Sequence, residues 1–152
     1  MDAIEIRLAE LGHVLPPPPS PGGNYVPHRI HGEILVLAGV ISSHGGIVTA
    51  GQVGGERTVD EGYAAACVCA LNALAAIKGA LGRLDRVEEF IYLGGYVNAV
   101  GGFDQSPQVI NGASDLFATL YGEPGKHARA AVAVAGLPRN ATVEIQVTVR
   151  FK

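Results

Sequence analysis

Charged residues are scarce in this chain of 152 residues. Asp, Glu, Lys and Arg together make up only 16% of the sequence, whereas hydrophobic residues make up 48%. A small monomer normally needs more charge than this to cover its surface with polar groups. The composition therefore predicts that some apolar surface is buried against another copy of the chain. The length predicts one domain with a core of its own.

The sequence also lacks any cluster of basic residues, and its formal net charge is -3. Nucleic-acid binding needs a basic patch, so the composition argues against a nucleic-acid partner. The N-terminus has no charged-then-apolar signal layout, and no apolar run approaches the roughly 18 residues that span a membrane. We expect a soluble, cytoplasmic protein without a membrane partner.

Cysteine is rare, and no metal-binding pattern is present. Cys67 and Cys69 stand two positions apart in a helical pattern, where side chains point away from each other, so they predict buried thiols rather than a disulfide. His28 and His31 have no third ligand at a recognisable spacing. The Gly-Gly pairs form no phosphate-binding motif and are interpreted as turns and bulges. We expect neither a metal nor another cofactor.

The N-terminal segment differs in pattern from the rest of the chain. Apolar residues at helical spacing predict a short amphipathic helix over residues 2–12, ending at Gly12. The prolines from Pro16 to Pro19 then predict a stiff spacer. This divides the chain into an extension, residues 1–20, and a domain, residues 21–152.

Strands and helices alternate within the domain. Residues 30–42 and 47–53 predict two strands joined at Gly45-Gly46, and Thr58 to Glu61 forms a capping box before a helix that ends at Gly82. Residues 87–97 predict a strand with a bulge at Gly94-Gly95.

A second helix and two strands complete the predicted order. Ser106 as N-cap and Pro107 at the first helical position begin the helix, which stops at Gly122. Two strands follow, and the last, from Val143 to Phe151, alternates apolar and polar residues. The whole order predicts an α+β domain with two helices on one face of a mixed β-sheet.

Two charged residues stand out in the final apolar strands. Arg129 opens one strand, and Glu144 lies in the next. A guanidinium offers a planar fork of donors that matches a carboxylate, so Arg129 predicts either an anion-binding group or a structural ion pair. If these strands form a hairpin turning about Pro138 and Arg139, Arg129 and Glu144 lie about four residues out of register, roughly 13 Å apart.

Four segments resemble the signature of the RidA/YjgF family of imine and enamine deaminases, in order and spacing. They are Pro21 to Tyr25, Val109 to Asn111, Ala128 to Val134 with Leu137-Pro138 after it, and Val143 to Ile145. The match runs from about Pro21 to Phe151.

The resemblance implies a chorismate-mutase-like fold, assembled as a homotrimer with clefts between subunits. It maps Arg129 onto the family's substrate-carboxylate arginine and Glu144 onto a glutamate that orients the attacking water. It places Tyr25 and Asn111 in the cleft and leaves the backbone of Ala131 as a binding group.

The sequence departs from the family pattern at two places. Ala131 stands where the family often has cysteine or another small polar residue, and Ala38-Gly39-Val40 replaces the family's Ser-Gly-Gln. His127, two residues before Arg129, falls where it can edge the cleft.

The leading hypothesis is cofactor-free hydrolysis of 2-imino or enamino acids to 2-oxo acids and ammonia, with a small carboxylate-bearing substrate. A trimeric protein that binds small carboxylates without catalysis is the alternative, which the Ala131 and Val40 departures favour. Ribonuclease or translation-inhibiting activity, a label often attached to the family, is a third, against which the acidic charge argues.

Overall fold

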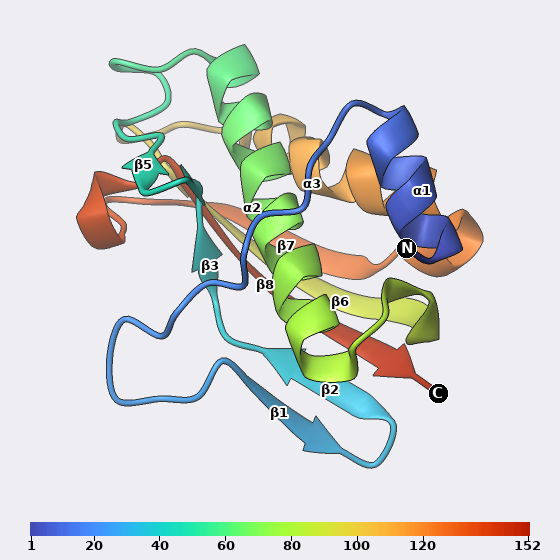
Figure 1. Cartoon of the computed structure of the whole chain (residues 1–152). Helices are drawn as coiled ribbons and strands as arrows, with labels where there is room; N and C mark the ends of the chain where they lie inside the picture. Colours follow the sequence, from blue (N-terminus) through green and yellow to red (C-terminus); the bar gives the residue numbers. More distant parts are fainter.

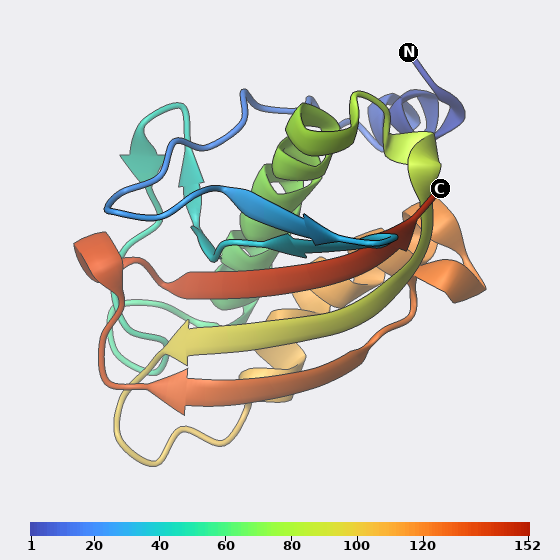
Figure 2. The ribbon, with the colours of Figure 1, turned by 90° about the horizontal axis from the view of Figure 1, so that it is seen from below.

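The computed structural model describes residues 1–152, and its centre is a curved mixed sheet with helices on one face (Figure 1, Figure 2). In chain order the helices and strands are α1 (Ala3–Glu10), β1 (His28–His31), β2 (Ile34–Leu37), β3 (Val40–Ile41), β4 (Ser43–His44), β5 (Ile47–Val48), α2 (Val59–Leu81), β6 (Val87–Asn98), α3 (Ser106–Tyr121), β7 (Ala128–Val134) and β8 (Val143–Phe151). Short 3-10 helices η1 (Leu84–Arg86), η2 (Glu123–Gly125) and η3 (Pro138–Asn140) complete the list. The α+β class with a mixed sheet is therefore confirmed.

The order of strands in the sheet is not the order in the chain. The main sheet runs β1-β2-β8-β6-β7, with β3 also paired to β8, and only β6 and β7 are parallel. The last two strands do not form the hairpin that the sequence analysis considered, because β6 lies between β7 and β8. The strand β7 is thus an edge of the sheet, with one row of backbone groups unpaired in the chain.

The predicted capping signals set both ends of α2. The Thr58 side chain accepts from the Glu61 backbone while the Glu61 carboxylate accepts from the Thr58 backbone, and Gly82 ends the helix in a left-handed conformation. In α3 the N-cap is Gln105 rather than Ser106, and Gln105 makes no side-chain capping bond. Pro107 therefore stands at the second helical position instead of the first, where its missing N–H also has no partner within the helix.

Three strand predictions need correction. The strand expected over residues 47–53 is only β5, Ile47–Val48. The single strand expected over residues 30–42 is broken by a hairpin, because Gly32 adopts a positive φ of 59° between β1 and β2. The bulges in β6 lie between Val87 and Tyr92, so Gly94-Gly95 is not a bulge. Instead, a Cβ at Gly95 would lie 2.7 Å from Ile110 Cγ1, so this glycine lets α3 approach the sheet closely.

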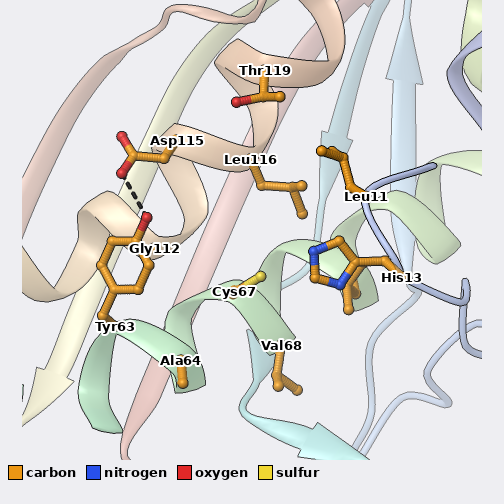
Figure 3. A pocket seen from close by; sticks show the side chains of 11 residues that line it. Leu11, His13, Tyr63, Ala64, Cys67, Val68, Gly112, Asp115, Leu116 and Thr119 are labelled. Atoms are coloured by element: carbon orange, nitrogen blue, oxygen red, sulfur yellow. Dashed lines mark hydrogen bonds between the residues drawn. The ribbon is translucent and has the colours of Figure 1, made fainter. Parts of the chain in front are cut away.

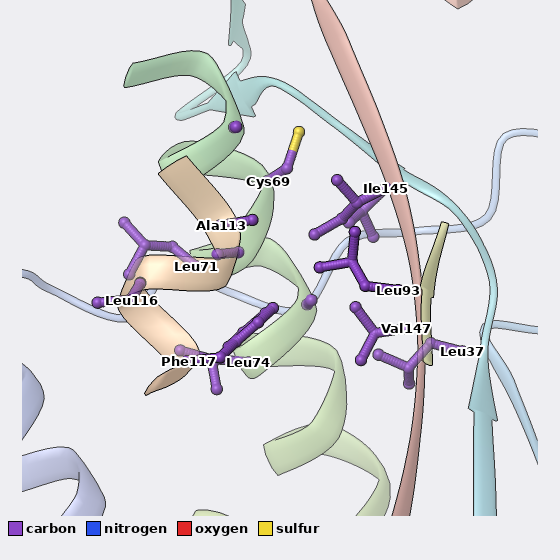
Figure 4. Close-up of a cluster of buried hydrophobic side chains, with 14 of the residues drawn as sticks. Leu37, Cys69, Leu71, Leu74, Leu93, Ala113, Leu116, Phe117, Ile145 and Val147 are labelled. Carbon is purple, nitrogen blue, oxygen red and sulfur yellow. The ribbon is translucent and has the colours of Figure 1, made fainter. Parts of the chain in front are cut away.

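The hydrophobic core fills the space between the sheet and the two long helices, as Figure 4 shows. The inward side of β8 carries Val143, Ile145, Val147 and Val149, all buried, in the predicted alternation. The core explains why α2 is buried along most of its length, although it is long and apolar enough by composition to cross a membrane. That composition contradicts the expectation that no stretch of the chain approaches a membrane span.

The predicted N-terminal helix is confirmed as α1, which packs beside α3 and η1. Ile4 and Leu8 are buried there, and Gly12 follows with a φ of 84°. Polar contacts also fix the helix: the Asp2 carboxylate accepts from the Leu84 backbone N–H, Glu5 pairs with Lys78, and Arg7 donates to the Leu120 carbonyl. These contacts join the extension to α2, η1 and α3.

We expect Gly112→Ala to destabilise the protein, because α2 and α3 meet at this glycine. A Cβ there would lie 2.0 Å from the Tyr63 carbonyl oxygen, which is backbone and cannot turn away. Without that clash, alanine would favour the helix by up to about 1 kcal/mol. Overpacking against backbone outweighs this gain, so the net loss should be about 2–3 kcal/mol.

Urea unfolding at matched protein concentration measures the effect of Gly112→Ala. The control is Gly101→Ala, since nothing lies within 4 Å of a Cβ at Gly101. An unchanged midpoint in Gly112→Ala would show that the helices can separate at little cost.

Candidate functional site

Arg129 and Glu144 belong to strands that are separated by β6. Arg129 pairs with Leu93 of β6, whereas Glu144 pairs with Tyr96, three positions further along the same strand. Two strand spacings and three residue rises place their backbones about 14 Å apart. The distance is close to the one expected from the sequence, but its cause is the intervening strand and not an offset hairpin.

The two side chains also leave opposite faces of the sheet. Leu93, opposite Arg129, is buried against the helices, so Arg129 points toward the helical face. Glu144 alternates with buried Val143 and Ile145, so it points toward the face that no helix covers (Figure 2). Within one chain Arg129 and Glu144 therefore do not share a site.

Arg129 is held against the start of α3. Its Nη1 donates to Ser114 Oγ at 3.0 Å, and its Nη2 donates to the Pro107 carbonyl at 3.2 Å. No carboxylate of the same chain pairs with it, so an ion pair within the chain is absent. A guanidinium has five N–H donors, and those not used by α3 can bind an anion.

Asn111 and Ala131 lie on the same side of the sheet as Arg129. Asn111 is on α3, four residues after Pro107 and three before Ser114, which places it on the helix face that contacts Arg129. Ala131 is two residues after Arg129 on β7 and so on the same face of that strand. We call Arg129, Ala131 and Asn111 the arginine half-site.

The sequence did not predict the role of Ser114, which also contacts His127. Ser114 Oγ lies 2.8 Å from His127 Nε2, and His127 Nδ1 lies 2.9 Å from the Gly125 carbonyl. The one feature of the sequence that pointed to Ser114 was its position three residues after Asn111, which places both on the same face of α3. His127 does lie beside Arg129, as the sequence allowed.

Glu144 is half-buried with no cation beside it. Burial alone raises the pKa of its carboxyl above the usual range. The carboxylate lies against the backbone of Gly39, where a Cβ would be only 2.6 Å from Glu144 Oε2. A larger residue than glycine at position 39 would thus displace the carboxylate. The segment Ala38-Gly39-Val40, which departs from the family pattern, therefore lies directly against Glu144.

Tyr25 lies near this second group of residues. It shares a small hollow of about 20 Å³ with Gly39 and Val40. Glu144 does not line this hollow, and Gly39, which lies against the Glu144 carboxylate, links the two. The Tyr25 hydroxyl accepts a hydrogen bond from the Gly22 backbone N–H at 2.8 Å, and the side chain is 51% exposed. We call Tyr25, Gly39 and Glu144 the glutamate half-site.

A much larger hollow of about 530 Å³ lies between α1, α2 and α3, and none of the predicted site residues lines it (Figure 3). Tyr63 donates to the Asp115 carboxylate at 2.7 Å on its wall, and this bond raises the pKa of Tyr63 to about 12. Burial raises the pKa of the Cys67 thiol, which favours the unreactive protonated form. The hollow therefore contains no activated nucleophile.

Comparison with known proteins identifies the family. The sequence model of the family described as "YjgF/chorismate_mutase-like, putative endoribonuclease" matches residues 5–149. The protein TCP17 of Trypanosoma cruzi is 42% identical over 151 residues, which cover 97% of this chain and 94% of that protein. The chain belongs to the YjgF/RidA family, and it has the chorismate-mutase-like fold of that family.

Solved structures agree with this assignment. The crystal structure of the protein Atu1372, of unknown function, from Agrobacterium tumefaciens has 45% sequence identity and a TM-score of 0.92, with 98% of this chain and 92% of that chain covered. RidA from the Antarctic bacterium Psychrobacter is 21% identical with a TM-score of 0.62, over 88% of this chain and 94% of that chain. The second likeness supports the fold alone.

Proposed function

We propose that this member of the YjgF/RidA family hydrolyses reactive 2-imino and enamino acids to 2-oxo acids and ammonia in the cytosol, without a cofactor. The observation that carries the proposal is the placement of Glu144, a carboxylate half-buried against Gly39 with no cation beside it, and this burial raises its pKa. A carboxyl group with a pKa nearer neutrality can accept a proton from water and later return it. A solvated surface glutamate would show no such shift.

Arg129 supplies the anchor for the substrate carboxylate. The N–H donors left free by Ser114 and Pro107 can hold a carboxylate as a fork, which fixes the neighbouring C=N carbon. Fixing that carbon beside a water molecule provides the proximity that the reaction in solution lacks.

The reaction then needs only water. The imine reacts in its protonated iminium form. Glu144 accepts one proton of the water as the water oxygen bonds to the iminium carbon, and the C=N electron pair passes to the nitrogen, which becomes a neutral amine. Glu144 returns this proton to the nitrogen, which makes it an ammonium leaving group. The C–N bond then breaks as the hydroxyl proton passes to the Glu144 carboxylate and the carbonyl forms, and Glu144 finally releases that proton to water. The sum is iminium plus water giving 2-oxo acid plus ammonium.

The two half-sites are complementary only if they come from different copies. The uncovered sheet face carries the exposed apolar side chains Val36, Tyr92 and Val132, all on the side from which Glu144 projects. Covering this face with other copies would remove the apolar surface from water. We propose a homotrimer in which the arginine half-site of one copy meets the glutamate half-site of the next.

The trimer predicts a molecular mass close to three times the chain mass of 15.7 kDa in light scattering at micromolar concentration. Val132→Asp should shift the protein toward monomer, because it places a charge on the proposed interface. The matched control is Ile6→Asp, which changes an exposed isoleucine on α1, on the opposite side of the molecule. A wild-type monomer would remove the shared site together with the assembly.

A carboxylate-binding protein without catalysis is the second candidate, and Ala131 favours it. An alanine at that position offers no side-chain polar group to the substrate. Turnover of freshly generated 2-iminobutanoate separates the two candidates. Release of 2-oxobutanoate above the uncatalysed rate supports the hydrolase, whereas binding of 2-oxobutanoate with no acceleration supports the binding protein.

Ribonuclease activity, which the family description names, is less well supported by this chain. The net charge of -3 does not favour a polyanion. Salt-dependent RNA binding by the purified protein would bring this candidate forward.

A further inference from the structure

We propose that Ser114 and His127 are positioning residues, which orient the Arg129 guanidinium through a chain of hydrogen bonds that runs in one direction. The chain joins Arg129 Nη1 to Ser114 Oγ at 3.0 Å, Ser114 Oγ to His127 Nε2 at 2.8 Å, and His127 Nδ1 to the Gly125 carbonyl at 2.9 Å. The effect of this hydrogen-bond chain on substrate binding rests on the proposed function, whereas the orientation of Arg129 by the chain is independent of it.

The chemistry of the end groups sets the direction of each bond. The Gly125 carbonyl can only accept, so His127 Nδ1 carries a hydrogen. Arginine can only donate, so Ser114 Oγ accepts from Arg129 and its own hydrogen is available for His127 Nε2. Every atom is satisfied when the imidazole is neutral and protonated on Nδ1.

The surroundings of His127 favour this neutral form. Burial lowers the pKa of the imidazole, and the charge of Arg129 lowers it further, while the bond to the Gly125 carbonyl acts in the opposite direction. The nearby charged side chains are those of Glu123 in η2 and of Lys126, its C-cap residue, and they are exposed and paired with each other. A second positive charge on the imidazole would face Arg129 across the same hydroxyl group.

The end of the hydrogen-bond chain at Gly125 and His127 is rigid. A Cβ at Gly125 would lie 2.1 Å from the Phe117 carbonyl oxygen, so only glycine lets η2 pack this closely on α3. The Phe117 ring meets the His127 ring nearly edge-on, with ring centres 6.2 Å apart and planes at 84°. The imidazole is therefore fixed by packing as well as by its hydrogen bond.

The consequence is an arginine held at two points. Ser114 holds Nη1, and the Pro107 carbonyl holds Nη2, so the plane of the guanidinium is defined. Removing the Ser114 hydroxyl leaves a single tether and lets the plane rotate. Misorientation of the fork weakens a bidentate carboxylate contact without removing the charge.

NMR spectroscopy of the full-length protein tests the proposal without any ligand. The ring nitrogen shifts should show His127 protonated on Nδ1, and the Arg129 Nε–H signal should be rigid. Ser114→Ala should make the Arg129 side chain mobile, whereas Ser114→Thr, which keeps the hydroxyl, should leave it rigid. The control is Thr119→Ala, an exposed position on α3 away from Arg129.

A ligand measurement extends the test to the proposed function. Ser114→Ala should weaken 2-oxobutanoate binding by about tenfold, the effect of one lost charge-assisted hydrogen bond, and His127→Phe, which removes only the neutral bond to Ser114, by about fivefold. If the wild type binds no 2-oxo acid but Arg129 mobility still follows the Ser114 hydroxyl, the proposed function fails and the positioning role stands. An Nε2-protonated His127 in the wild type, or a rigid Arg129 in folded Ser114→Ala, overturns the positioning role.

Discussion

Arg129→Lys is expected to lose iminoacid hydrolysis as fully as Arg129→Ala. Both variants should fall by on the order of a hundredfold or more in kcat/KM, because a misplaced reacting group alone can cost that much. The ammonium of lysine is a point charge and cannot present two parallel N–H donors to a carboxylate. It also cannot bond Ser114 Oγ and the Pro107 carbonyl simultaneously in the geometry of the guanidinium.

The comparison requires that both Arg129 variants remain folded and assembled. Thermal unfolding and light scattering establish this. The control is Arg83→Lys, which changes an exposed arginine that pairs with Asp85. Near-normal turnover in Arg129→Lys would mean that charge alone suffices, or that Arg129 serves the structure and not the substrate.

Glu144→Gln is expected to separate binding from catalysis. Glutamine keeps the shape of glutamate but cannot accept a proton from water, so turnover should fall by on the order of a hundredfold. Binding of 2-oxobutanoate, measured by calorimetry, should change little because Arg129 is intact. The control is Glu89→Gln, which changes an exposed strand glutamate and should leave both turnover and binding unchanged. Wild-type turnover in Glu144→Gln would contradict the proposed role of Glu144 in the hydrolysis.

The raised pKa of Glu144 adds a pH dependence to the same experiment. Glu144 must be ionised to accept a proton, so activity should be lost as the pH falls through its pKa in the folded protein. Since burial raises that pKa, the loss begins at a higher pH than for an ordinary glutamate. The acidic limb of the pH profile should be missing from the residual activity of Glu144→Gln.

Local signals in the sequence predicted local structure well. The capping box at Thr58, the stop at Gly82 and the alternation after Val143 all depend on neighbouring residues, and the structure confirms each of them. The hairpin at Gly32 was missed because a mostly apolar segment with scattered glycines looks like a continuous strand. Insertion of β6 between β7 and β8 is a long-range pairing that no local pattern reports.

The candidate site depended more on the family resemblance than on local patterns. The resemblance selected Tyr25, Asn111, Arg129 and Glu144, but only the sheet order and face show that they form two groups. Ser114 and His127 were not linked in the sequence, because their contact joins α3 to the start of β7 across η2. Such a contact depends on how the chain turns at Gly125 and not on spacing.

The central claim is that one site is completed by Arg129 of one copy and Glu144 of another, and mixed assembly tests it most directly. Arg129→Ala and Glu144→Gln, each inactive alone, are refolded together in equal amounts, and hydrolysis of 2-iminobutanoate is measured. Every mixed trimer then contains one interface with both residues intact. Random mixing predicts recovery to about a quarter of the wild-type activity. No recovery in trimers shown by mass spectrometry to be mixed would contradict a site shared between copies.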